Sequence, residues 1–152
     1  MTPAGPPARA GWPFHHAERI RFGDLDAMRH LNNVEFLRFF ETARIAFMQS
    51  VFPGHDPAAP TGDFGLIFAE AHIAYRSPGR FGEVVRTWIR PGSIARSSFR
   101  VEFEMRADDD AAGPDGRLMA EGYGVLVGYD YAAQAPMPLP ARVREALAPP
   151  AA

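Results

Sequence analysis

The sequence predicts an α+β domain in which an antiparallel β-sheet wraps one long helix. Residues 32–51 place apolar side chains at steps of four, three, four and four, which is the spacing of one helix face. Four strand-like runs follow, joined by short connections and without a second long helical pattern. Because a helix with a single apolar stripe cannot bury that stripe by itself, we expect the sheet to curve around it.

A short strand is expected before the helix, at residues 17–22, and a loop with three prolines and two glycines after it, at residues 52–63. The later strands are expected at residues 64–75, 83–90, 98–106 and 118–129. Pro91-Gly92 is expected to close the second of them, and the third alternates strictly between apolar and charged residues. A short final helix is expected after Pro140, since proline suits the first position of a helix.

The apolar stripe of the long helix consists of Phe36, Phe40, Ala43, Phe47 and Val51. The charged residues Arg38, Glu41 and Arg44 are expected to lie largely off this stripe. Asn32, followed three residues later by Glu35, predicts a capping box at the start of the helix.

A chain of 152 residues fits one domain with a real core, and we assign residues 14–148 to it. Residues 1–13, rich in Ala, Pro and Gly, are expected to form a flexible leader, and residues 149–152 a tail. The net charge of −2 gives no electrostatic case for binding nucleic acid or an anionic membrane. No stretch approaches the ~18 apolar residues of a membrane helix, so we expect a soluble protein, with the cytoplasm as its default location.

The chain contains no cysteine and no lysine, since arginine accounts for all 16 basic residues. This excludes disulfides, a thiol nucleophile, a thiolate metal site, a Schiff-base lysine and the lysine of a phosphate-binding loop. The five histidines show no spacing that completes a metal site. We therefore expect neither a metal ion nor a cofactor.

The most informative stretch is residues 22–36, which places the carboxylate of Asp26 a few residues ahead of the helix start. A helix N-terminus offers unpaired backbone N–H groups and a partial positive charge. A carboxylate beside such donors suits a nucleophile or base next to an oxyanion hole, with the backbone N–H of Asn33 as donor. The alternative is a turn aspartate that binds its own backbone or caps the helix, and this alternative applies more strongly to Asp24.

Other residues also allow two interpretations. His30 with Asp26 is either an acid–base pair, half of a metal site, or neither. Arg96-Ser97-Ser98 is either a solvated strand end or a contact for phosphate, whose geometry arginine suits. Glu41 is either a secondary acid–base candidate or part of a solvated helix face, and Phe36 either lines an acyl pocket or packs in the core.

The residues from Phe22 to Asn33, read as Phe-Gly-Asp-Leu-Asp-Ala-Met-Arg-His-Leu-Asn-Asn, are followed by Phe-Phe-Glu-Thr-Ala-Arg at 39–44. Together they resemble the hotdog-fold acyl-CoA thioesterases of the 4-hydroxybenzoyl-CoA thioesterase type. Weaker stretches agree in order at residues 71–78, 96–99 and 138–140, so that the resemblance covers roughly residues 17–147.

The resemblance implies a five-stranded antiparallel sheet around one long central helix, in homodimers or homotetramers whose active sites form between protomers. It implies that Asp26 is the catalytic carboxylate and that the backbone N–H of Asn33 stabilises the oxyanion. It also implies coenzyme A phosphate contacts from Arg96, Ser97 and Ser98. Many relatives have glycine where this chain has Arg29, which places substrate choice in question.

The resemblance thus implies an acyl-CoA thioesterase that hydrolyses a thioester to a free acid and coenzyme A. Either water or Asp26 itself attacks the carbonyl, and the sequence leaves both roles open. Two alternatives remain. One is a hotdog protein that binds an acyl thioester without hydrolysing it, and the other is a hydratase or dehydratase that uses Asp26 and His30.

Overall fold

The computed structural model describes residues 9–53, 56 and 64–148. Its strands and helices are, in chain order, β1 (Phe14–Arg19), α1 (Asn33–Val51), β2 (Gly65–Tyr75), β3 (Val84–Ile94), β4 (Ser98–Ala107), β5 (Arg117–Asp130), β6 (Ala135–Pro136) and α2 (Ala141–Leu147). Two short 3₁₀ turns, η1 (Phe22–Asp24) and η2 (Asp110–Ala112), lie in connections. No helix in these ranges is long and apolar enough to cross a bilayer.

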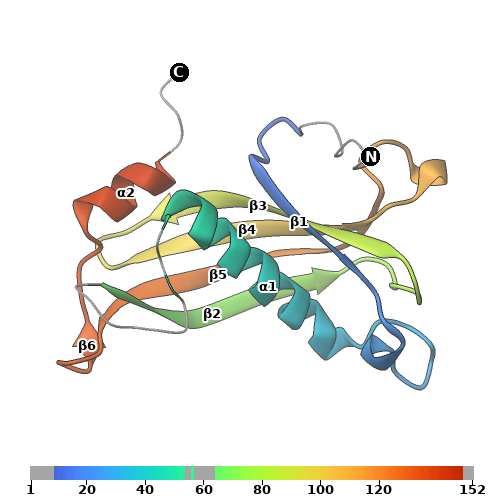
Figure 1. Ribbon diagram of the computed structural model, residues 1–152, viewed down its shortest axis with the longest axis horizontal. Helices are drawn as coiled ribbons and strands as arrows, with labels where there is room; N and C mark the ends of the chain where they lie inside the picture. Colours follow the sequence, from blue (N-terminus) through green and yellow to red (C-terminus); the bar gives the residue numbers. More distant parts are fainter. Residues whose placement is uncertain (1–8, 54–55, 57–63, 149–152) are drawn as a thin grey trace.

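The strands form one antiparallel sheet in the order β1-β3-β4-β5-β2, and the two-residue strand β6 pairs with β5. Figure 1 shows α1 lying across one face of this curved sheet, with β1 passing beside it. Five antiparallel strands around one long helix are the architecture that the sequence predicts, and the prediction is confirmed. β6 is the only strand of the described sheet that the sequence analysis did not anticipate.

The core lies between α1 and the inner face of the sheet. Phe40 on α1 stacks on Phe103 of β4, with 4.2 Å between ring centroids. Each fully buried phenylalanine contributes about 1.5–3 kcal/mol through the hydrophobic effect. A Cβ atom on Gly124 of β5 would meet the rings of Phe40 and Phe68, so glycine at this position lets the helix approach the sheet closely.

Arg44 departs from the prediction, because it is buried on the helix with only 8% of its surface exposed. Its guanidinium lies 4.1 Å from the ring centre of Phe68 on β2, in a cation–π contact. Burial lowers the pKa of Arg44, while the charge of Glu41 acts in the opposite direction. The expectation that Arg44 lies off the buried stripe was wrong, because β2 extends far enough around the helix to cover it.

Three predicted strand boundaries were also wrong. The first strand begins at Phe14 rather than residue 17, and it ends at Arg19, because the N–H of Ile20 binds the carbonyl of Glu83 and the chain then turns through η1. β3 continues through Pro91 to Ile94, with an irregular register between these two residues that accommodates the proline.

The ends of the chain lie partly outside the described residues. Of the expected leader at residues 1–13, residues 9–13 are described, and they lie against the sheet: Arg9 donates a 2.8 Å hydrogen bond to Glu104, and Trp12 is buried. Residues 1–8, most of the expected loop at 52–63 and the expected tail at 149–152 are not described.

Candidate active site

Asp26 opens a tight hairpin that projects just before α1. Leu25 and Leu31 pair as an isolated antiparallel bridge, and the N–H of Asp26 donates to the carbonyl of His30 at 2.9 Å. The N–H of Arg29 donates back to the carbonyl of Asp26 at 3.0 Å, and Arg29 has φ = +63°. A three-residue loop whose last residue is left-handed is a common hairpin geometry, in which that residue is usually glycine. Arginine in this conformation costs about 1–2 kcal/mol.

The carboxylate of Asp26 is held by this hairpin but remains partly open. Its Oδ1 accepts hydrogen bonds from the N–H of Met28 at 2.8 Å and of His30 at 3.3 Å. Its Oδ2 accepts no hydrogen bond from any residue that the structure describes, and the side chain is half-buried. Oδ1 therefore has the role of a turn aspartate, which was the alternative interpretation from the sequence. Oδ2 has no partner among the described residues and is open to a substrate or a water molecule.

Asp24 lies two residues earlier and has a different environment, because it is only 4% exposed. It accepts hydrogen bonds from the backbone N–H of Arg21 at 2.8 Å and from the Arg21 guanidinium at 3.0 and 3.2 Å. Burial disfavours the charged carboxylate, but the Arg21 hydrogen bonds and charge outweigh burial and lower the pKa of Asp24. The Asp24 carbonyl accepts from the N–H of Asn32 at 2.9 Å, which fixes the hairpin to the helix start.

The first turn of α1 leaves one backbone donor free. Asn32 is the N-cap: its side-chain oxygen accepts from the N–H of Val34 at 3.2 Å, and its carbonyl accepts from the N–H of Glu35 at 2.8 Å. The expected capping box does not form, because the N–H of Asn32 donates to Asp24 rather than to the Glu35 side chain. The N–H of Asn33 has no acceptor among the described residues. It is therefore the free amide at the positive end of the helix.

Tyr75, at the end of β2, also touches this region, although the sequence analysis did not single it out. Its hydroxyl donates a 3.1 Å hydrogen bond to the carbonyl of Asn33. Its ring meets Phe36 edge-to-face, with 5.0 Å between centroids. Phe36 itself is buried in the core beneath the helix start. No local sequence signal identifies Tyr75, because its role depends on where β2 ends relative to α1.

The side chains of the remaining acid–base candidates make no hydrogen bond to Asp26. His30 binds the Asp26 carboxylate through its backbone N–H, and its imidazole makes no hydrogen bond to any described residue. Glu41 is exposed on α1. Within the described ranges, no group of three or more His, Asp or Glu side chains is arranged to hold a metal ion.

Arg96, Ser97 and Ser98 lie at the connection between β3 and β4, at the other end of the sheet from Asp26. The carbonyls of Arg96 and Ser97 accept from Leu139 and Gly128, at 2.9 and 2.7 Å, which fixes the loop. The three side chains bind no described residue, and that of Arg96 is exposed. β4 separates this loop from the hairpin by about 30 Å. One chain therefore does not bring the two predicted halves of the site together.

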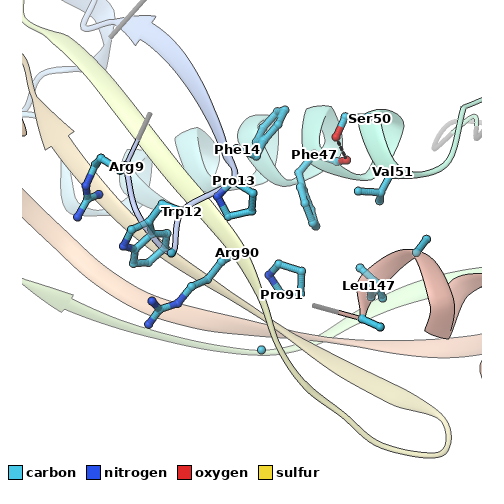
Figure 2. A pocket seen from close by; sticks show the side chains of 14 residues that line it. Arg9, Trp12, Pro13, Phe14, Phe47, Ser50, Val51, Arg90, Pro91 and Leu147 are labelled. Carbon is cyan, nitrogen blue, oxygen red and sulfur yellow. Dashed lines mark hydrogen bonds between the residues drawn. The ribbon is translucent and has the colours of Figure 1, made fainter. Parts of the chain in front are cut away.

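A cavity of about 610 Å³ lies at the opposite end of α1 from Asp26. Its walls come from the segment before β1, the last turns of α1, β3 and α2, and include Trp12, Phe47, Pro91 and Leu147 (Figure 2). Because a 19-residue helix is about 28 Å long, this cavity is remote from the candidate carboxylate. No pattern in the sequence predicts this cavity.

Similar structures come from thioesterases. A thioesterase from Thermus thermophilus, solved with coenzyme A and zinc, is 31% identical to this chain, covers 91% of it and 94% of its own chain, and has a TM-score of 0.76. A 1,4-dihydroxy-2-naphthoyl-CoA thioesterase from Synechocystis is 19% identical, covers 88% of this chain and 94% of its own, and also has a TM-score of 0.76. The second likeness shows the fold alone.

A curated relative was found as well, the 1,4-dihydroxy-2-naphthoyl-CoA hydrolase of Prochlorococcus marinus (strain MIT 9313). It is 25% identical over 100 residues, which span 61% of this chain and 66% of that protein. The Prochlorococcus hydrolase and the Thermus thermophilus thioesterase support thioester hydrolysis. The structural likenesses confirm the predicted hotdog fold. The sequence profile of the Thioesterase-like superfamily matches residues 20–147, and the chain therefore belongs to that family.

Proposed function

We propose that this protein hydrolyses an acyl- or aryl-CoA thioester to the free acid and coenzyme A, with Asp26 and the backbone N–H of Asn33 as its catalytic groups. The observation that carries the proposal is the pairing of a firmly held carboxylate, open at Oδ2, with the free N–H at the start of α1. The Leu25–Leu31 bridge and the hydrogen bond from Asn32 to Asp24 hold the two parts in one unit. The activity of the relatives points to the same chemistry.

The reaction needs an attacking oxygen and a donor for the oxyanion. Either Asp26 takes a proton from water, whose oxygen then attacks the thioester carbon, or Asp26 attacks directly and water cleaves the resulting anhydride. In both routes the carbonyl oxygen gains negative charge, and in this proposal the N–H of Asn33 donates a hydrogen bond to it. The carbon–sulfur bond then breaks, and the thiolate of coenzyme A leaves and takes up a proton.

The separation of Asp26 from Arg96 supports a site shared by two chains. β2 is the last strand of the sheet, so one of its edges is unpaired among the described strands. If two β2 edges pair antiparallel about a twofold axis, the Tyr75 end of one strand lies beside the Gly65 end of the other. The first end touches Asn33, and the second lies at the end of the sheet that carries Ser98. A homodimer, alone or within a tetramer, would thus place coenzyme A phosphates on the partner subunit's Arg96 loop.

The test is hydrolysis of a panel of acyl- and aryl-CoA thioesters, followed by thiol release, for wild type and Asp26→Asn. Asparagine keeps an oxygen that can accept the hairpin N–H groups, so the variant should fold with an unchanged melting curve. We expect turnover to fall about 10²–10⁴-fold, the usual contribution of a positioned base. Asp110→Asn, on the exposed turn η2, is the matched control and should retain activity.

Two results would contradict the proposal. Full turnover by Asp26→Asn would show that this carboxylate is not catalytic. Tight binding of thioesters by the wild type without thiol release would indicate a binding protein rather than an enzyme.

A further inference from the structure

Arg29 occupies a position in the Asp26 hairpin where a large side chain is unfavourable. It is one of two non-glycine residues in the described ranges with positive φ, the other being Gln134. Glycine adopts this conformation without the steric conflict that arginine meets between its Cβ and the following carbonyl. The hairpin hydrogen bonds impose this conformation, and the exposed Arg29 side chain adds no hydrogen bond, ion pair or ring contact with any described residue.

Two basic residues on either side of the hairpin in the sequence differ from Arg29 in this respect. Arg21 pairs with Asp24, and Arg38 pairs with Glu35. Arg29 thus presents an uncompensated guanidinium three residues from the candidate catalytic carboxylate, without an ion pair to it. Its position favours an anion that approaches from outside the chain.

Apolar side chains flank the same hairpin. Met28, at the tip of the hairpin, is 73% exposed. Phe22 and Phe81, whose segments are hydrogen-bonded to the base of the hairpin, are 80% and 64% exposed. The two phenylalanine rings meet edge-to-face at 6.2 Å. Arg80, directly before Phe81, is also exposed, and its guanidinium makes no hydrogen bond, ion pair or ring contact with a described residue. An apolar surface with free cations beside it is complementary to a molecule that has an apolar body and a negative group.

We propose that Arg29 is a specificity residue that selects acyl groups bearing a carboxylate. This inference rests on the proposed thioesterase function, which places the thioester carbonyl at Asp26. The pyrophosphate of coenzyme A lies at the far end of the pantetheine arm from that carbonyl, beyond the reach of a side chain three residues from Asp26. A negative group on the acyl side of the thioester is within reach of Arg29, and the exposed Arg96 loop is better placed for the phosphates.

The experiment compares matched pairs of thioesters that differ in one carboxylate: 4-carboxybenzoyl against 4-methylbenzoyl, and adipoyl against hexanoyl. Each acyl group is offered both on coenzyme A and on N-acetylcysteamine, which has no phosphate. The quantity measured is the kcat/KM for the carboxylated thioester divided by the kcat/KM for its neutral partner. We expect Arg29→Gly to lower this ratio about 10–100-fold on both carriers, which is the usual effect of losing a hydrogen bond to a charged group. Arg29→Lys should recover part of the ratio, and Arg38→Gln, a paired arginine on the exposed face of α1, should leave it unchanged.

A melting curve separates this role from a structural one. Because glycine relieves the positive φ, Arg29→Gly should raise Tm by about 3 °C even as the carboxylate preference is lost. An unchanged ratio on both carriers would overturn the proposal. Equal losses for both members of a pair on coenzyme A, absent on N-acetylcysteamine, would also overturn it and assign Arg29 to phosphate.

Failure of the proposed function gives a different pattern. If the wild type hydrolyses none of these thioesters, the enzyme assignment fails, and calorimetry with non-hydrolysable thioether analogues of the same pairs then tests Arg29 alone. Preference for the carboxylated analogue that disappears in Arg29→Gly would support the specificity role. Equal affinity for both analogues would overturn it.

Discussion

Two aspartates separated by one residue have opposite environments, and this difference assigns them different roles. Asp24 is buried, and its carboxylate accepts hydrogen bonds from Arg21. Asp26, in contrast, has one carboxylate oxygen that accepts no hydrogen bond from a described residue. The carbonyl of Asp24 also fixes the N–H of Asn32. Asp24 is therefore a structural residue that positions the hairpin carrying Asp26.

At the scale of one residue, we predict that Asp24→Asn lowers the free energy of unfolding by about 1–2 kcal/mol at neutral pH. The variant keeps an acceptor for the Arg21 N–H but loses the charge that makes these hydrogen bonds strong. Urea unfolding at pH 7 measures the loss. Asp108→Asn is the control, because Asp108 forms an exposed ion pair with Arg86, whose loss should change stability by at most about 1 kcal/mol.

The effect of Asp24 should also depend on pH. Its pKa in the folded protein is lowered, so its contribution is fully present above the unfolded pKa of about 4 and is lost as the pH falls through the folded value. The difference in stability between wild type and Asp24→Asn should therefore shrink below about pH 4. A difference that stays constant from pH 7 to pH 3 would show that the Asp24 charge contributes nothing.

At the scale of the helix, the two consecutive asparagines at the start of α1 have distinct functions. Asn32 caps the helix with its side chain, while the backbone N–H of Asn33 is left free. A cap that satisfied the Asn33 amide instead would remove the candidate oxyanion donor. The geometry of the cap therefore decides which backbone amide of the first turn has no acceptor among the described residues.

We predict that Asn32→Ala lowers the free energy of unfolding by about 1 kcal/mol, the usual effect of losing an N-cap side chain. Asn33→Ala is the matched control, because the Asn33 side chain makes no hydrogen bond within the described residues. It should change stability by a few tenths of a kcal/mol at most. Chemical denaturation of both variants measures the difference, and equal losses would argue against the observed cap.

At the scale of the whole molecule, the length of the sheet separates the two halves of the proposed site. Asp26 and Asn33 lie at the Tyr75 end of β2, and the Arg96 loop lies at the other end of β4. Pairing of two β2 edges would bring one half from each chain together. The same pairing would cover an edge strand that otherwise invites aggregation.

We predict that inactive subunits complement one another. Asp26→Asn and Arg96→Ala should each be weakly active alone. An equal mixture that is refolded together should regain roughly a quarter of wild-type turnover. The reason is that half of the randomly formed dimers contain one chain of each variant, and each such dimer has one intact site out of two. Thiol release measures recovery, and differently tagged chains measure the fraction of mixed dimers. If mixed dimers form without any recovery, the two residues do not share a site between chains.

The sequence by itself determined the order of the elements and the architecture. The spacing of apolar residues indicates which side chains face the core. This spacing is helical between residues 32 and 51 and alternates strictly over residues 98–106, so each pattern can be read from a short stretch of the chain. The motif around Asp26 indicated the family to which the chain belongs. These predictions succeeded because each depends on residues close together in the chain.

Only the tertiary structure decided how distant segments meet. The burial of Arg44 depends on Phe68 of β2, the continuation of β3 past Pro91 depends on its pairing with β4, and the distance between Asp26 and Arg96 depends on the length of the sheet. The left-handed conformation of Arg29 is likewise imposed by the hydrogen bonds that close the hairpin. Periodicity reports which face of an element is apolar, but the register of the sheet sets which residues touch across it.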